Sequence, residues 1–235
     1  MSNSERERIL AAVEKALGNP PRDESIFSIP QAASHPSWVG PEESWGNLET
    51  ELKNLLARFH MAKDLEGARA VVRSIIEEHS VRTAVRWEHP LLEALGLDEL
   101  LQEAGVELLR PEDRKESFVQ TSAGADLGIT AAEAIVAQSG TVVVRARAGQ
   151  ERSTSLLPPV HLAVLTTEQR LRSMADLIPV FRDWLSKQGR LPSAVHMIAG
   201  PSRTADIALT MTLGAHGPKV LHVLVVEAGA VRAVD

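Results

Sequence analysis

The chain has 235 residues, of which 44% are hydrophobic and 24% are charged, and a net charge of −6, which argues against a disordered, fibrous or membrane-spanning chain. It has no cysteine, so it cannot hold a disulfide, a thiolate zinc site or a cysteine-ligated iron–sulfur cluster, and a redox centre would have to lie on a partner or on a bound organic cofactor. The negative charge and the scarcity of aromatic residues argue against nucleic-acid binding.

Residues 4–17 are the first predicted element, an amphipathic helix with a capping box between Ser4 and Glu7. Residues 18–46 contain five prolines and are predicted to form an extended arm. Trp38 and Trp45 suggest that part of this arm docks on the chain's own core or, alternatively, on a partner. We therefore expect an N-terminal helix and arm over residues 1–46 and an α/β domain over residues 47–235. The N-terminus lacks the apolar core of a signal peptide, so we expect a cytoplasmic location.

The remaining chain alternates predicted helices and strands. The expected helices span residues 47–62, 65–79, 89–104 with a break at Gly96, 167–188 with a kink at Pro179, and 203–213. The expected strands span residues 82–87, 106–109, 134–137, 141–145, 160–165, 194–199 and 221–227. A tight Ser-Gly turn joins the strands 134–137 and 141–145. The alternation predicts a layered α/β fold in which helices flank a parallel or mixed sheet.

The first candidate for chemistry is the turn from Gly200 to Asp206, between a predicted strand and a predicted helix. The N-terminus of a helix binds anions through its free N–H groups, and Arg203 adds donors suited to carboxylate or phosphate. Ser202 and Thr204 can cap or donate. The alternative is a simple helix cap in which Ser202 caps and Asp206 offsets the helix dipole. Residues 118–235 also carry a small basic excess, which favours an anion, although the acidic residues 1–117 can equally be solvated helix faces.

The second candidate is His216, which lies in a loop between Gly214 and Gly217 just before the last predicted strand. A histidine is suited to act as a general acid or base, because its side chain titrates near neutrality. The alternative is a turn histidine that only contacts the backbone. Since this loop and the Gly200 turn both lie at ends of predicted strands, we expect them to form a ligand crevice together.

Two further segments contain polar residues that could line a site. In the first, Gly128 and Gly140 allow a close backbone approach, Glu133 could act as a carboxylate base, and Thr141 follows the turn. The alternative is a helix start followed by a hairpin with an exposed Glu133. In the second, which runs from Arg152 to His161, Arg152 and the hydroxyls of residues 153–155 could line an anion site. The alternative is a polar loop before a strand, with His161 half-buried.

The other histidines are not predicted to form a metal site. His60 and His79 are separated in the acidic half, and His196 and His222 lie in predicted strands, where a single histidine is typical of a hydrogen-bonded core residue. No spacing typical of metal ligands is present. The chain also lacks the Gly-x-Ser-x-Gly motif of serine hydrolases and the Gly-x-Gly-x-x-Gly motif of dinucleotide-binding folds.

Taken in order, these segments make the chain resemble the LUD-domain family. The matching segments are Asp126–Thr130, Ile135–Thr141, Leu157–His161, Gly200–Ile207 and Gly214–Pro218. The resemblance implies a fold like that of ribose-5-phosphate isomerase and CoA transferases. It also implies a role in oxidising L-lactate to pyruvate alongside iron–sulfur partner proteins, as a component of an L-lactate dehydrogenase complex. Iron–sulfur clusters would then lie on the partner subunits, and this chain would hold no cofactor.

The favoured function is therefore that of a subunit of a lactate-oxidising complex with a pocket for a small carboxylate or phosphate. His216 and Asp206 are the catalytic candidates, with His216 accepting a proton and Asp206 orienting Arg203 or the turn. The candidate anion-binding residues are Gly200, Ser202, Arg203, Thr204, Gly140, Thr141 and Arg152. Two alternatives stay open: a stand-alone enzyme on a phosphorylated or CoA-type substrate, and a non-catalytic assembly or regulatory subunit. Whether this subunit is itself the enzyme is left open.

Overall fold

The computed structural model describes residues 7, 8, 11, 12, 15, 45–110, 117–189, 192–205, 211–213 and 216–232. The chain divides into two compact units, residues Met1–Ser34 and His35–Asp235. In the first unit, all the described residues are helical, as predicted for residues 4–17. The other residues of the predicted helix, and those of the predicted arm as far as residue 44, lie outside the described residues.

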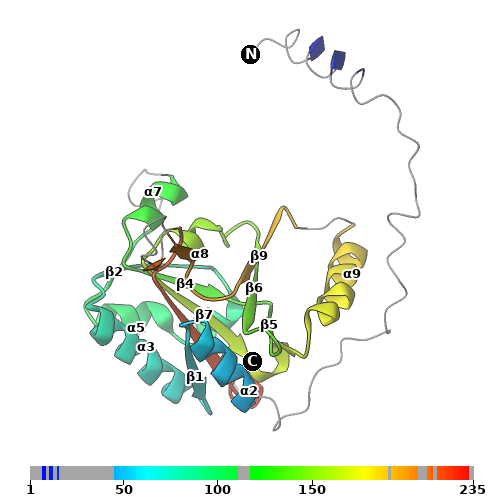
Figure 1. Ribbon diagram of the computed structural model, residues 1–235. Helices are drawn as coiled ribbons and strands as arrows, with labels where there is room; N and C mark the ends of the chain where they lie inside the picture. The colour runs from blue at the N-terminus through cyan, green and yellow to red at the C-terminus, as the bar shows by residue number, and fades with distance from the viewer. Residues whose placement is uncertain are drawn as a thin grey trace. The chain divides into compact units, whose positions relative to one another are not determined.

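A six-stranded parallel sheet forms the centre of the second unit (Figure 1). Its strands, in spatial order, are β1 (Arg58–Ala62), β12 (Val220–Val226), β7 (Val160–Thr166), β4 (Leu127–Ala131), β2 (Thr83–Arg86) and β3 (Glu107–Leu108). The central strands β12, β7 and β4 are buried almost throughout. Such continuously apolar strands are typical of a parallel sheet that is covered on both faces.

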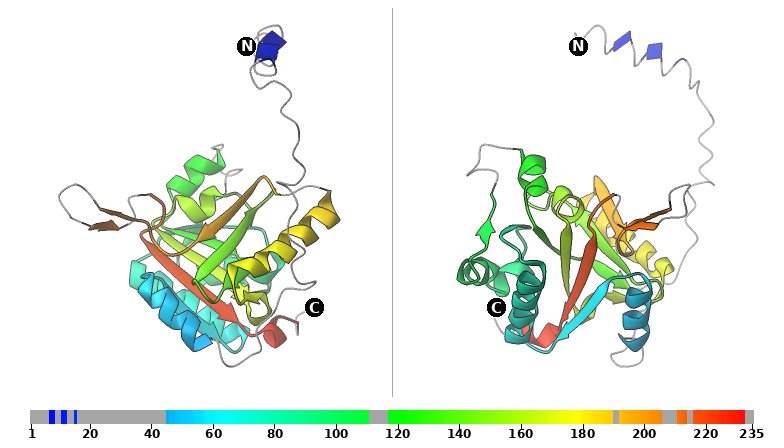
Figure 2. Two further views of the ribbon diagram at one scale, coloured as in Figure 1. Left: turned by 45° about the vertical axis from the view of Figure 1, so that its right-hand side comes forward. Right: turned by 60° about the vertical axis from the view of Figure 1, so that its left-hand side comes forward.

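One face of this sheet is covered by helices, namely α3 (Leu65–His79), α4 (Pro90–Ala94) and α5 (Leu97–Glu103). Alternate residues of each strand point to opposite faces. Leu224 of β12 accordingly packs with the helices, whereas Val223 and Val225 pack in a second cluster with Leu48 and Leu52 of α2 (Trp45–Asn54). Figure 2 shows helices α3 and α5 on one side of the sheet and the second sheet on the other.

The second sheet has the strand order β8 (Arg170–Leu171), β5 (Ala134–Val136), β6 (Thr141–Ala146) and β9 (Ala194–Ile198). Strands β5 and β6 are antiparallel around residues 138–140, which confirms the predicted Ser-Gly turn. Helix α9 (Leu177–Gln188) packs on this sheet through Leu177, Val180 and Phe181. The predicted layered α/β fold is therefore confirmed.

The remaining elements are short. They are α7 (Phe118–Ala123), α8 (Ser153–Leu156), the 3-10 turns η2 (Thr167–Gln169) and η3 (Met174–Asp176), the strands β10 (Arg203–Ala205) and β11 (Met211–Leu213), and α10 (Ala228–Arg232). Strands β10 and β11 pair antiparallel in a hairpin that projects from the two sheets in Figure 2. No helix among the residues that the structure describes has the length and apolar character needed to cross a membrane.

Three predicted helices are wrong in whole or in part. The helix predicted over residues 203–213 is replaced by the β10–β11 hairpin. The helix predicted over residues 47–62 ends at Asn54, because Leu56 adopts a left-handed backbone conformation with φ of 60°, and β1 follows. The helix predicted over residues 167–188 begins only at Leu177, so Pro179 lies in its first turn, where proline is tolerated, instead of kinking its middle.

The start of α3 offers a direct test of local stability. The Asp64 carboxylate accepts a hydrogen bond from the Gly67 N–H at 2.7 Å and so caps the helix. We expect Asp64→Ala to lower the free energy of unfolding by about 1 kcal/mol, measured by urea denaturation. The matched control is Lys63→Ala at the exposed neighbouring position, which makes no cap. Equal stability of the two variants would contradict the assigned cap.

Candidate functional site

A cavity of about 320 Å³ lies at the amino ends of β7 and β12. Its wall is formed by the end of α8, the start of β7, the segment from β9 to the Gly200 turn, and the loop before β12. We call it the histidine pocket. Its polar side chains are those of Ser155, His161, His196, Ser202 and His216.

Two loops that are distant in sequence are tied together at the mouth of the pocket. The backbone N–H of His216 donates a hydrogen bond to Ser202 Oγ at 3.1 Å. Gly200 lies in the left-handed region with φ of 84°, and a Cβ added there would lie 2.3 Å from the carbonyl oxygen of Leu55. Only glycine therefore fits at position 200, and this close approach fixes where Ser202 lies.

The fully buried His161 gives the pocket its most unusual electrostatic property. Its Nε2 lies 2.9 Å from Thr130 Oγ1, while its Nδ1 is buried and makes no hydrogen bond within the part of the chain that the structure describes. Burial lowers the pKa of His161 from its ordinary value of 6.5 to about 3. Burial first, and then the charge of Arg152, lower the pKa of His196. Both imidazoles are therefore neutral at physiological pH.

The wall chemistry suits a small polar ligand that accepts and donates hydrogen bonds. Ser202 Oγ accepts from the backbone of His216, so its own hydroxyl hydrogen is left to donate. Among the described residues that line the pocket, none carries a carboxylate that would repel an anion. His216 is exposed at the mouth, where an imidazole can exchange protons with both ligand and solvent.

Some of the predicted site residues are brought together in this pocket and others lie outside the described residues. Gly200, Ser202 and His216 all line it. Arg203 and Thr204 follow directly in β10. Asp206 and Gly214 lie outside the described residues. Since no helix begins at Arg203, the predicted source of anion affinity, a helix N-terminus, is wrong.

The other predicted residues lie elsewhere. A Cβ at Gly140 would contact the side chains of Leu55 and Leu52, so this glycine serves packing against α2, and Thr141 Oγ1 lies 2.8 Å from Ser139 Oγ in the same turn. Arg152 is exposed next to α8, and its charge reaches His196.

Glu133, a possible base in the sequence, is instead held in an ion-pair network. Its carboxylate lies 3.0 Å from Arg145 Nη2 and also binds Arg147. Both guanidinium groups use its Oε1 as the acceptor. This arrangement favours a structural role for Glu133 over a role as a proton acceptor.

The pocket lies at the opposite edge of the main sheet from where ligands usually bind in parallel α/β sheets, which is outside the carboxyl ends of the strands. The Gly200 turn and the His216 loop therefore line one pocket, but it lies at the amino ends of β7 and β12 and not at the carboxyl ends. His216 precedes β12, and the Gly200 turn follows β9, which belongs to the second sheet. His196, interpreted as a core strand residue, is only half-buried and lines the pocket, whereas His161 is more deeply buried than predicted.

Three other histidines meet on the far face of β12, although their spacing in the sequence gave no such indication. His222 lies 2.9 Å from both His60 and His79 through ring nitrogens. Because successive residues point to opposite faces of a strand, His222 faces away from the pocket that Leu221 lines. The described part of the chain therefore has two separate histidine groups.

Comparisons with known proteins identify relatives of this chain. Residues 47–226 match the family model described as the LUD domain. The chain is 30% identical over 225 residues to lactate utilization protein C of Halalkalibacterium halodurans, covering 94% of this chain and 97% of the relative. It is 28% identical over 230 residues to lactate utilization protein C of Bacillus subtilis strain 168, covering 94% and 95%.

Two further matches extend this picture. The uncharacterized protein YkgG of Escherichia coli K12 is 32% identical over 174 residues, which cover 74% of each chain. The crystal structure of a DUF162 family protein from Deinococcus radiodurans superimposes with a TM-score of 0.54 and 19% identity, over 80% of this chain and 99% of that one. At that identity the structural match supports the fold alone.

Proposed function

This chain belongs to the LUD-domain family, and from that membership we propose that it acts in lactate utilization, as a subunit of a complex that oxidises L-lactate to pyruvate. The observation that carries the proposal is the similarity to lactate utilization protein C over nearly the whole length of both chains. The absence of cysteine from this chain adds support for iron–sulfur partner proteins as the electron acceptors.

We assign the histidine pocket as the place where a small carboxylate such as lactate or pyruvate binds. Its volume suits a small molecule, and the Ser202 hydroxyl is free to donate to a carboxylate oxygen. His161 contributes a neutral imidazole to the wall. Arg203 and Thr204, which directly follow Ser202, and Arg152 near His196 keep their proposed role of attracting the anion.

In this proposal His216 is the proton acceptor. Oxidation of a 2-hydroxy acid to a 2-oxo acid removes two electrons and two protons. We assign the hydroxyl proton to His216, which is the exposed imidazole at the mouth of the pocket. The Cα hydrogen and the two electrons would go to a redox centre on the partner proteins, whose iron–sulfur clusters would carry the electrons. Asp206 keeps its proposed role of orienting the turn.

The test uses a strain that lacks the gene and regains it on a plasmid. Removing a general base typically costs 10²–10⁴-fold in rate. We therefore expect a double variant, Ser202→Ala with His216→Gln, to lower lactate oxidation in extracts by about 100-fold or more. It should also abolish growth on L-lactate. The matched control is His89→Asn, far along the chain, where asparagine can replace the His89 side chain that caps α4.

Co-purification separates this role from the alternatives. The double variant should still co-purify with the iron–sulfur proteins, because it changes the pocket and not the rest of the fold. Full activity of the complex that contains the double variant would refute a substrate role for the pocket. An assembly role would replace our proposal under two conditions. The double variant would have to keep its activity, and deletion of residues 1–46 would have to abolish both activity and co-purification.

A further inference from the structure

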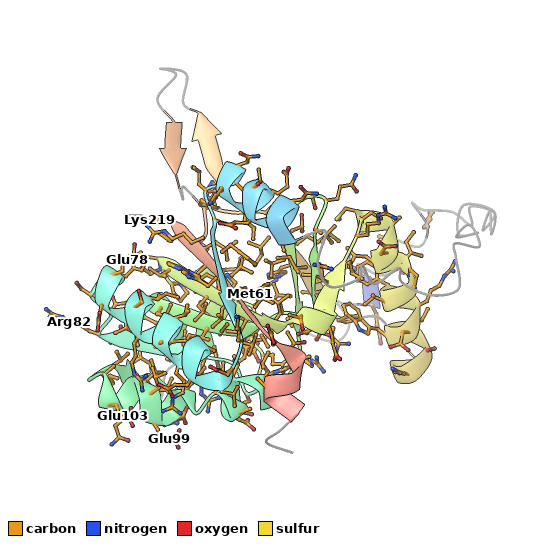
Figure 3. All side chains as sticks on the ribbon, turned by 90° about the horizontal axis from the view of Figure 1, so that it is seen from below. Met61, Glu78, Arg82, Glu99, Glu103 and Lys219 are labelled. Carbon is orange, nitrogen blue, oxygen red and sulfur yellow. The ribbon has the colours of Figure 1, made fainter. Side chains whose placement is uncertain are left out.

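Three histidines and one glutamate from three elements meet on the helix-covered face of the main sheet. His60 lies on β1, His222 on the neighbouring strand β12, and His79 is the last residue of α3, preceded by Glu78. His60 Nε2 lies 2.9 Å from His222 Nδ1, and His79 Nε2 lies 2.9 Å from His222 Nε2. Figure 3 shows Glu78 at the end of α3, on the side of Lys219, which precedes β12.

The donor atoms of three of these residues lie close together. One ligand atom each from Glu78, His79 and His222 lies within 4.8 Å of the other two. In a tetrahedral zinc site, two nitrogens at 2.0–2.1 Å from the ion lie about 3.3 Å apart. The two Nε2 atoms of His79 and His222, now 2.9 Å apart, would therefore separate by about 0.4 Å on binding zinc.

The hydrogen-bond pattern around His222 also fits a cation. A neutral imidazole has one N–H and one lone pair. If the Nε2 lone pair of His222 faced a metal, its Nδ1–H would donate to His60 Nε2. That is the usual arrangement in metal sites, where the second ring nitrogen of a ligating histidine is held by a neighbouring acceptor.

We propose that Glu78, His79 and His222 form a binding site for a divalent transition metal of the zinc class, with His60 as the positioning residue for His222. His222 is fully buried, whereas the side chains of His79 and Glu78 are 16% and 42% exposed, so the site opens to solvent on the glutamate side. Three protein ligands with an open side leave a fourth position for water or another ligand.

The charges around the cluster indicate which metals it selects. Arg58 binds the Glu78 carboxylate, which holds that carboxylate in place and offsets its charge. Affinity must therefore come from the imidazole nitrogens and not from excess negative charge. Imidazole ligands suit zinc, cobalt, nickel and copper, whereas magnesium and calcium prefer oxygen ligands.

The test titrates the full chain, without an added histidine tag, with Zn²⁺ in competition with a chromophoric chelator. We expect one tightly bound equivalent that excess Mg²⁺ does not displace. His79→Gln and Glu78→Gln should each weaken binding at least tenfold, and His60→Gln should weaken it about 10–100-fold, as the loss of an outer hydrogen-bond partner does. Co²⁺ absorption provides a second readout of coordination by imidazole.

His196→Gln is the matched control, because it removes a histidine of the pocket and leaves the cluster intact. It should bind Zn²⁺ as the unaltered chain does. The proposal is overturned if no tight equivalent binds, or if binding is unchanged in both His79→Gln and Glu78→Gln. It is also overturned if only the His196 variant loses the metal. Glu78 is on the surface, so Glu78→Gln is expected to fold. A loss of zinc binding in this variant would therefore report on the site and not on unfolding.

Discussion

Replacing Gly128 by alanine is expected to lower the free energy of unfolding by more than about 3 kcal/mol. A Cβ at this position would lie 1.9 Å from the carbonyl oxygen of Thr154 and 3.0 Å from Cγ of Pro158. The first of these atoms belongs to the backbone of α8, so no side-chain rotation can relieve the clash. Either β4 or α8 would have to move, and both are buried.

Urea denaturation of the Gly128→Ala variant measures the effect. The matched control is Gly124→Ala, four residues earlier, where a Cβ would make only ordinary contacts at 3.7 and 3.8 Å and φ is −90°. Alanine there should be neutral or stabilise the fold by up to about 1 kcal/mol, because it restricts the unfolded chain. If Gly128→Ala were as stable as Gly124→Ala, the packing assigned to β4 and α8 would be wrong.

The consequence of this contact extends to the candidate site. Helix α8 supplies Ser155 and Leu156 to the wall of the histidine pocket. Gly128 was interpreted from the sequence as a place where the backbone approaches a ligand. The structure shows instead that it approaches the chain's own backbone, and that this approach seats α8 against the sheet.

Much of the fold could be predicted where an element has a single strong pattern. Helix α3 was predicted with its observed bounds, since its apolar face and its cap are both local. Strand β4 was missed because residues 126–130 begin with Asp and contain Gly, which are typical of a turn. The Asp126 carboxylate is used across the sheet instead, accepting hydrogen bonds from the backbone of Arg82 and Thr83.

The hairpin β10–β11 shows a different limit. Residues 207, 209, 211 and 213 are apolar and alternate with Ala or Thr, which is a strand pattern. The helix prediction rests instead on Ser202 and Asp206, which are typical of a helix start. The two local signals compete, and over Met211–Leu213 the structure follows the strand pattern.

The site could be predicted only in part, since its assembly depends on long-range register. The Gly200 turn and His216 were expected to meet, and both line the pocket. His161 enters it because β7 and β12 pair with His161 opposite Leu221, and sequence spacing carries no information on that register. The same holds for His60 and His222, which are 162 residues apart and in hydrogen-bond contact.

The buried His161 should make the protein lose stability as the pH falls. Its pKa is about 3 in the folded chain and about 6.5 when it is exposed. Between these values the unfolded chain binds a proton that the folded chain does not bind, so unfolding is favoured progressively below pH 6.5. The slope from this one group is up to about 1.4 kcal/mol per pH unit, which amounts to about 2 kcal/mol by pH 5.

Urea denaturation between pH 7.5 and pH 5 of the unaltered chain and of His161→Gln measures this slope. Burial also lowers the pKa of His222 to about 3, so both proteins share its contribution, and a chelator in the buffer keeps any metal off the second cluster. We expect His161→Gln to be less stable at pH 7.5 but to lose less stability on acidification, because glutamine does not titrate. Parallel pH profiles for the two proteins would mean that a proton reaches His161 in the folded chain. That result would contradict the depth of burial assigned to His161.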